Sequence, residues 1–247
     1  MDNQYLGTFK QYFASLISKP YLHTAFNSLW VPGERQAQFA KRLGFSGQSC
    51  WRGLYSCDVD VFCANSENNI KRKKSFLFVG RYVERKGLDI LMEAYAAYRS
   101  RVREPWGLAC IGSGDLNFIL KDQPGVKDLG FIQPENLPSI MFEYGCFVLP
   151  SRFEAWGVVV HEAASAGMPI ICSEAVGASV HLVNEHYNGY TFKNEDVSEL
   201  ATCLKSISEK DAIQLEQMSE NSRQISKQYS PQFWANILVA QTKLLSQ

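Results

Sequence analysis

Apolar residues recur along this chain at two spacings, and the alternation between them predicts short strands separated by helices. Uninterrupted apolar runs stand at residues 76–79, 108–111 and 170–172, and another ends at Leu149. Such runs are typical of strands that are buried on both faces of a sheet. Apolar positions recur three and four residues apart over 87–101. A short helix is expected after Gly157, with small residues at Ala163, Ala164 and Ala166. This order of strand, helix and strand predicts βαβ units in a parallel sheet.

Residues 1–63 show a different pattern. Three- and four-residue spacing predicts an amphipathic helix over 5–17, and Pro32 and Gly44 bracket a second helix. A short strand is expected at 51–55. The apolar stripe of the first helix needs a partner. We favour packing within a domain over docking on a membrane surface, because the stripe carries little positive charge.

Two further segments complete the pattern. Residues 64–75 are polar and end in a basic run, which is typical of a linker. We interpret this run as a solvated hinge, with an anion-binding patch as the alternative. Towards the end of the chain, helices are expected over 196–208 and 211–229, and a final helix with its own apolar stripe begins at Ser230.

Composition narrows the class of protein. The chain has 247 residues, 46% of them hydrophobic. Its 25 basic and 25 acidic side chains balance, so no net charge attracts the protein to nucleic acid or anionic lipid. Its seven cysteines contain no C-x-x-C pair and indicate reduced core thiols. No apolar run is long enough to span a membrane, and the first residues do not resemble a signal peptide. We expect a cytoplasmic protein, with peripheral contact at the inner face of the membrane as an extension of that expectation.

The segment from Leu149 to Cys172 carries the candidate chemistry. Two glutamates stand eight positions apart in it, Glu154 in the loop after a strand and Glu162 in the second turn of the following helix. A helix N-terminus at the carboxyl end of a parallel strand attracts phosphate, and carboxylates accept hydrogen bonds from sugar hydroxyls. The pair would therefore suit a phosphorylated sugar. The alternative is that Glu162 is a solvated helix residue and Glu154 a loop charge.

A second candidate lies after the strand at 76–79. Arg81 and Lys86 stand between that strand and the next helix, where a diphosphate would lie. When the sugar of a nucleotide-diphosphate sugar is transferred, negative charge builds up on the diphosphate oxygen that leaves. Fixed cations stabilise that charge without a metal. The acidic residues show no ligand spacing for a metal ion, and no cofactor or metal is expected.

The segment F-E-A-W-G-V-V-V-H-E-A-A-S-A-G-M-P-I-I at 153–171 resembles the E-x7-E segment of retaining glycosyltransferases of the two-Rossmann GT-B architecture. This resemblance implies that Glu154 contacts the hydroxyls of the donor sugar and Glu162 the ribose of the nucleotide. It also implies that the backbone at Gly157 and Val158 approaches the diphosphate.

Further segments resemble the same family in order along the chain. G-R-x-x-x-x-K-G at 80–87 is similar to its donor-phosphate clamp, which implies donor-contacting roles for Gly80, Arg81 and Lys86. The resemblance also implies that some residues only line the donor cleft or lie near the base. These are Gly112 and Gly114 after one strand, and Phe131 and Ile132, beside Gly130, after the next.

The chain departs from the family pattern at three places. Ser56 and Cys57 replace an Asn-Gly pair, and His181 stands where the family has glutamate. Residues 1–63 are also too few for the full first Rossmann domain that holds the acceptor. The expected division is a remnant of that acceptor domain at 1–63, a linker at 64–74, a Rossmann-like, doubly wound donor domain at 75–229 and a closing helix at 230–247.

These observations lead to one expected function and two alternatives. The expected function is retaining transfer of a hexose from a nucleotide-diphosphate sugar to a saccharide or lipid-linked acceptor, in the synthesis of cell-surface polysaccharide or lipopolysaccharide. The alternatives are a non-catalytic remnant that binds a nucleotide sugar or a protein partner, and an epimerase of GT-B architecture. No nucleic-acid partner is expected. Self-association through uncovered apolar faces is expected if the chain is a fragment.

Overall fold

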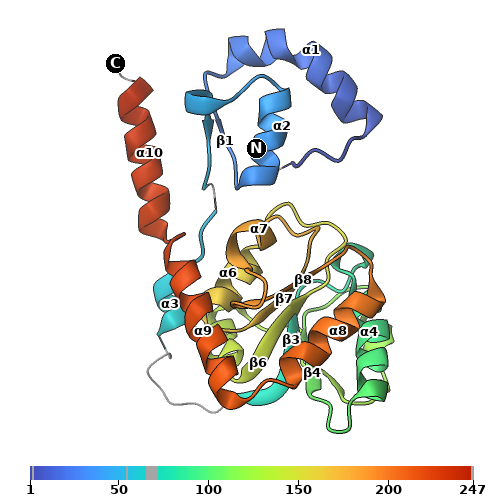
Figure 1. Ribbon diagram of the computed structural model, residues 1–247. Helices are drawn as coiled ribbons and strands as arrows, with labels where there is room; N and C mark the ends of the chain where they lie inside the picture. Colours follow the sequence, from blue (N-terminus) through green and yellow to red (C-terminus); the bar gives the residue numbers. More distant parts are fainter. Residues whose placement is uncertain (2, 54, 65–71, 246–247) are drawn as a thin grey trace. The chain divides into compact units, whose positions relative to one another are not determined.

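The computed structural model of the chain describes residues 1, 3–53, 55–64 and 72–245 (Figure 1). Its contacts divide the chain into two compact units. The first unit is Met1–Ser56 together with Tyr229–Gln247, and the second is Cys57–Gln228. The second unit contains every candidate site residue named above. Most of the expected linker, residues 65–71, lies outside the described residues.

A six-stranded sheet forms the centre of the second unit. Its strands are β3 (Lys73–Val79), β4 (Gly107–Ile111), β5 (Val126–Asp128), β6 (Tyr144–Leu149), β7 (Ile170–Ser173) and β8 (Gly189–Phe192). Every neighbouring pair is parallel, in the order β5-β4-β3-β6-β7-β8. The chain first builds the sheet outward from β3 and then returns to place β6 on the other side of β3. The expected doubly wound α/β fold is confirmed.

Helices cover both faces of this sheet (Figure 1). They are α3 (Val59–Cys63), α4 (Leu88–Arg101), α5 (Leu137–Met141), α6 (Val158–Ser165), α7 (Ser179–Leu182), α8 (Val197–Ser208) and α9 (Ala212–Lys227). Short 3-10 turns lie at η2 (Glu84–Lys86), η3 (Asn117–Leu120) and η4 (Pro134–Asn136). Helix α4 packs with α8, and α6 packs with α9 and α3. Right-handed crossovers that run in opposite directions from β3 place the helices on opposite faces.

The core of the second unit lies on both faces of the sheet. All six residues of β6 are buried, as are Phe76, Leu77 and Phe78 of β3. Parallel strands with helices on both faces need apolar side chains at successive positions, which explains the uninterrupted runs in the sequence. Ala163 and Ala164 of α6 are fully buried because small side chains allow the helix to pack closely.

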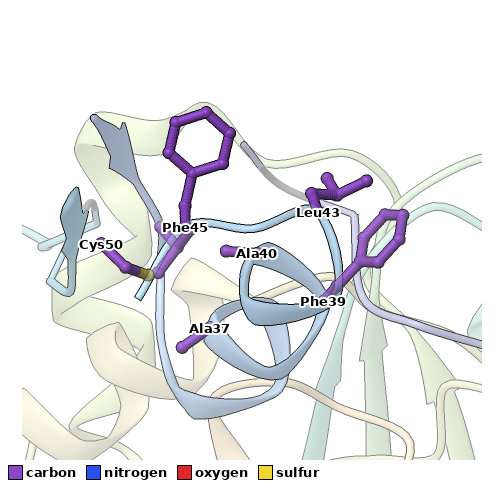
Figure 2. Close-up of a cluster of buried hydrophobic side chains, with 7 residues drawn as sticks. Ala37, Phe39, Ala40, Leu43, Phe45 and Cys50 are labelled. Carbon is purple, nitrogen blue, oxygen red and sulfur yellow. The ribbon is translucent and has the colours of Figure 1, made fainter. Parts of the chain in front are cut away.

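The first unit has a core of its own. It contains α1 (Phe9–Ala25), α2 (Glu34–Arg42), η1 (Gly47–Ser49), the parallel pair β1 (Leu29–Trp30) and β2 (Cys50–Trp51), and α10 (Pro231–Leu245). Figure 2 shows its cluster of buried side chains, which consists of Val31, Ala37, Phe39, Ala40, Leu43, Phe45 and Cys50. The final helix belongs to this unit, because Trp234 stacks on Trp30 with ring centroids 5.0 Å apart.

Helix α1 keeps most of its apolar stripe exposed. Thr8 caps its N-terminus by accepting a hydrogen bond from the Gln11 N–H group, so the helix begins four residues later than expected. Leu22 packs against the buried cluster of the unit. The side chains of the stripe are more than half exposed at Phe9, Tyr12, Phe13, Leu16, Ile17 and Tyr21. Within the part of the chain that the structure describes, no helix is long and apolar enough to cross a membrane.

Two local expectations were wrong. The sequence also favours a helix over 136–144, but the structure ends this helix at Met141 and begins β6 at Tyr144. The basic run is not wholly solvated, because the Arg72 guanidinium donates to the carbonyls of Met141 and Tyr144 at 3.0 Å and to that of Ala166 at 2.5 Å. Burial lowers the pKa of Arg72 to about 10. Carbonyls at the ends of α5 and α6 have few partners within their own helices, and a buried guanidinium satisfies several at once.

Candidate functional site

The candidate site lies where the strand order reverses. Strands β3 and β6 are neighbours, with Leu77 opposite Phe147, and their carboxyl ends carry the turn at 80–87 and the loop at 150–157. Ligands bind at such a switch point because the loops that follow the two strands diverge and leave room between them. The fold thus brings the two candidate segments of the sequence to one place.

Lys86 and Glu154 meet at this switch point. The Lys86 ammonium is ion-paired with the Glu154 carboxylate across 68 positions of sequence. The two side chains are only 12% and 15% exposed. A second cation, the Arg85 Nη1, lies 3.6 Å from the same Glu154 oxygen and donates to the Phe153 carbonyl at 3.1 Å. Sequence reasoning missed Arg85, although its position directly before Lys86 was the available signal.

Close backbone contacts hold the surrounding turns together. Gly87 has a φ of 67°, and a Cβ atom there would lie 2.1 Å from the Pro150 carbonyl oxygen. In the same way, a Cβ atom at Gly112 would lie 1.9 Å from the Gly80 carbonyl oxygen. Gly114 lies against the Tyr82 backbone. Only glycine allows these approaches, so the expected lining residues Gly112 and Gly114 join the turns after β3 and β4.

The loop that carries Glu154 is also bonded to the loop after β7. The Glu154 backbone forms a bridge with Val176, and its carbonyl accepts from the Gly177 N–H group at 2.9 Å. The loop ends at Gly157, whose φ of 97° lets the chain enter α6 at Val158. The N–H groups at the start of α6 therefore lie directly after the loop that positions Glu154.

Glu162 lies one turn further along α6 and is largely buried. Its carboxylate has no hydrogen bond or ion pair with any residue that the structure describes. Burial raises the pKa of Glu162 to about 7, because the charged form loses water without gaining a partner. The interpretation of Glu162 as a solvated helix residue is therefore wrong. A buried carboxylate of this kind is available to accept hydrogen bonds from a ligand.

The remaining candidates, Arg81, Phe131 and Ile132, take no part in the ion pair. The Arg81 side chain is exposed, and its guanidinium has no partner among the described residues. Phe131 is 65% exposed and Ile132 half-buried after β5, which β4 and β3 separate from β6. A hydrogen bond from the Gly112 N–H group to the Gly130 carbonyl at 2.9 Å ties this segment to the turn after β4. The structure does not bring Phe131 or Ile132 into contact with Lys86 or Glu154.

Two histidines in the same region have structural contacts. His161 is fully buried in α6, where its Nδ1 accepts from the Cys57 N–H group at 3.1 Å and its Nε2 lies 3.0 Å from the Ser226 carbonyl. Burial lowers the pKa of His161, which favours the neutral ring that this pattern requires. His181 packs on Trp156 with ring centroids 5.5 Å apart. Among the described residues, no group of three His, Cys, Asp or Glu side chains could hold a metal ion.

Comparison with known proteins identifies the family. Residues 64–225, more than half of the chain, match the family model described as glycosyl transferases group 1. The chain belongs to this family. An uncharacterised glycosyltransferase from Haemophilus influenzae is 29% identical over 194 residues, which are 74% of this chain and 54% of that protein. The chain spans between about a third and about half of the length of the first three curated relatives that it matches.

Solved structures of GT-B glycosyltransferases share the fold. Staphylococcus aureus TarM, in a complex that includes UDP, aligns with a TM-score of 0.78 at 14% identity, over 97% of this chain and 49% of TarM. Anabaena HepE, in complex with UDP and glucose, aligns with a TM-score of 0.70 at 19% identity, over 92% of this chain and 67% of HepE. The six-stranded parallel unit matches the C-terminal domain of the GT-B architecture, as the sequence predicted.

Proposed function

We propose that the second unit binds a nucleotide-diphosphate sugar, and that the protein transfers its hexose with retention of configuration to a saccharide or lipid-linked acceptor. The observation that carries this proposal is the meeting of Lys86 and Glu154 at the switch point of the sheet, beside the start of α6. Membership in the family and the UDP in the TarM and HepE complexes support it. Synthesis of cell-surface polysaccharide or lipopolysaccharide is the process in which we place this transfer.

Each group has a role in this proposal. Lys86 and the free guanidinium of Arg81 bind the diphosphate and stabilise the charge that develops when the bond to the sugar breaks. The N–H groups at the start of α6 bind the same phosphates. Glu154 accepts hydrogen bonds from sugar hydroxyls, and it is ion-paired with Lys86 while no ligand is bound.

The nucleoside is held by the more distant groups. The partly buried Glu162 carboxylate accepts from the ribose hydroxyls, and the exposed Phe131 with Ile132 lies near the base. Gly80, Gly112 and Gly114 shape the turns along this side of the cleft. The first unit, Met1–Ser56 with Tyr229–Gln247, belongs to the acceptor side in the same proposal, and the second unit is the donor domain. Helix α3 (Val59–Cys63) packs on α6 and therefore goes with the donor domain.

Binding and transfer need separate tests, because the chain spans only part of its relatives. Calorimetry with UDP, GDP and the two nucleosides tests binding. Lys86→Gln should lose affinity for the diphosphate and retain affinity for the nucleoside. Lys73→Gln is a matched control. Lys73 also forms an ion pair, with Glu143, but it lies at the first residue of β3, whereas Lys86 follows the other end of that strand. Equal effects of the two variants would contradict the proposal.

Transfer is measured with radiolabelled UDP- and GDP-sugars and saccharide or lipid-linked acceptors. Acceptor-dependent turnover would establish the enzyme. Tight binding with no transfer to any acceptor would favour the alternative of a non-catalytic protein that binds a nucleotide sugar. GT-B transferases react in a cleft that closes on donor and acceptor together, which supplies orientation that the donor side alone lacks.

A further inference from the structure

Arg152 lies in the candidate loop, two residues before Glu154, and makes four side-chain hydrogen bonds. Its Nη1 and Nη2 atoms donate to the two carboxylate oxygens of Asp89 at 2.8 and 2.6 Å. Its Nε donates to the Glu195 carboxylate at 2.7 Å, and Nη1 also donates to the Glu84 carbonyl at 2.7 Å. The guanidinium therefore uses most of its donors on three different partners.

These partners come from segments that follow two other strands, whereas Arg152 itself follows β6. Asp89 and Glu84 belong to the turn after β3 and the first turn of α4, and Glu195 lies in the turn after β8. The Arg152 backbone makes two further bonds, from its N–H group to the Arg85 carbonyl at 2.9 Å and from the Asn194 amide to its own carbonyl at 3.2 Å. Arg152 thus joins the turn that carries Lys86 to the loop that carries Glu154.

The contacts of Arg152 fix the positions of the segments around it more tightly than an ordinary surface ion pair would. A single exposed ion pair contributes little to the stability of the fold. A bidentate guanidinium–carboxylate contact, in contrast, fixes both the distance and the orientation of the two groups. The Arg152 side chain is 23% exposed, and its hydrogen bonds hold the pKa of Asp89 below its ordinary value. The Arg85 carbonyl that Arg152 holds belongs to the residue next to Lys86, so a shift of Arg152 moves both members of the Lys86–Glu154 pair.

We propose that Arg152 is a positioning residue that sets the separation between the Lys86 ammonium and the Glu154 carboxylate, and thereby the affinity for the diphosphate sugar. The second part of this inference rests on the function proposed above. Arg152 itself makes no contact with the donor in this scheme. It acts through the two loops that it joins.

The experiment compares Arg152→Gln with Arg223→Gln. Arg223 is a matched control, because its guanidinium also binds two carboxylates, those of Glu216 at 2.8 Å and Glu220 at 3.0 Å, but on α9. Both variants lose two ion pairs, so a general loss of stability should affect them alike. Asp89→Asn is a milder second variant at the same junction in case Arg152→Gln does not fold.

The first readout needs no ligand. The rate at which an acylating reagent modifies the Lys86 amine, followed by mass spectrometry, reports on its pairing with Glu154. We expect this rate to rise in Arg152→Gln and Asp89→Asn and to stay at the wild-type value in Arg223→Gln. An Arg152→Lys variant should restore part of the protection, since it keeps the charge but not the bidentate contact.

The second readout is calorimetry with UDP- and GDP-sugars and the matching nucleosides. We expect Arg152→Gln to lower the affinity for the sugar nucleotide by about tenfold and the affinity for the nucleoside little. The reason is that a misplacement of about 1 Å in a binding site is costly. Unchanged Lys86 labelling and unchanged affinity would overturn the inference. If the wild-type chain binds no nucleotide while Lys86 labelling still depends on Arg152, the proposed function fails and the positioning role stands.

Discussion

Replacement of Glu162 by glutamine should stabilise the second unit at neutral and alkaline pH and leave its stability unchanged in acid. The native pKa of Glu162 is about 7, against an ordinary value of 4.5, because burial penalises the carboxylate. Between these two values the native state binds more protons than the unfolded state, so the free energy of unfolding falls as pH rises. Glutamine is neutral throughout and does not show this loss.

The size of the effect follows from the two pKa values. Their difference corresponds to roughly 3 kcal/mol at about 1.36 kcal/mol per pH unit. The stability of the wild type should therefore match that of Glu162→Gln below about pH 4.5 and fall behind it progressively up to about pH 7. Above that value the difference should remain constant.

Urea unfolding of both proteins at several pH values measures this difference. Glu93→Gln is the control, because it removes the charge of a glutamate that is exposed on α4. A difference between wild type and Glu162→Gln that does not vary with pH would refute the reasoning from burial. Under the proposed function, a bound nucleotide favours the charged carboxylate, so calorimetry in buffers of different ionisation enthalpy should detect a proton released on binding near neutral pH.

Three further predictions follow from the geometry. Arg81→Ala should lower the calorimetric affinity for a nucleoside diphosphate far more than that for the nucleoside. It should leave the midpoint of urea unfolding unchanged, since Arg81 has no partner among the described residues. Gly87→Ala should cost at least about 1 to 2 kcal/mol in urea unfolding, because its Cβ atom would meet the Pro150 carbonyl and its φ is positive. Phe9→Ser combined with Phe13→Ser should abolish the self-association that we expect from the exposed stripe of α1, as measured by light scattering.

The chain offers a control for each of these predictions. Equal losses of nucleoside and diphosphate affinity in Arg81→Ala would mean that the residue acts through folding. Gly130→Ala has a similar φ of 66° but no atom near its Cβ, so it should cost less than Gly87→Ala. Phe118→Ser removes an equally exposed aromatic from the second unit and should leave light scattering unchanged. A monomeric wild type would contradict the third prediction.

Local features of the second unit could be predicted from the sequence because their causes are local. The run at 76–79 has to be a strand covered on both sides, since four successive apolar residues cannot alternate between core and water. Gly157 and Gly167 mark the two ends of α6 because the chain has a positive φ at both positions. Helix α5 could not be placed well, because its five residues are too short for an apolar period to appear.

By itself, the sequence determined β3, β4, β6 and β7 and most helices of the second unit. It also placed Arg81, Lys86 and Glu154 after strands and Glu162 in the helix that follows Glu154. Only the tertiary structure decided which of these residues meet. Lys86 pairs with Glu154 because β6 lies beside β3, and no local pattern specifies that neighbour. The buried state of Glu162 and the junction at Arg152 likewise depend on segments far apart in sequence, since burial and ion pairing are set by what surrounds a side chain.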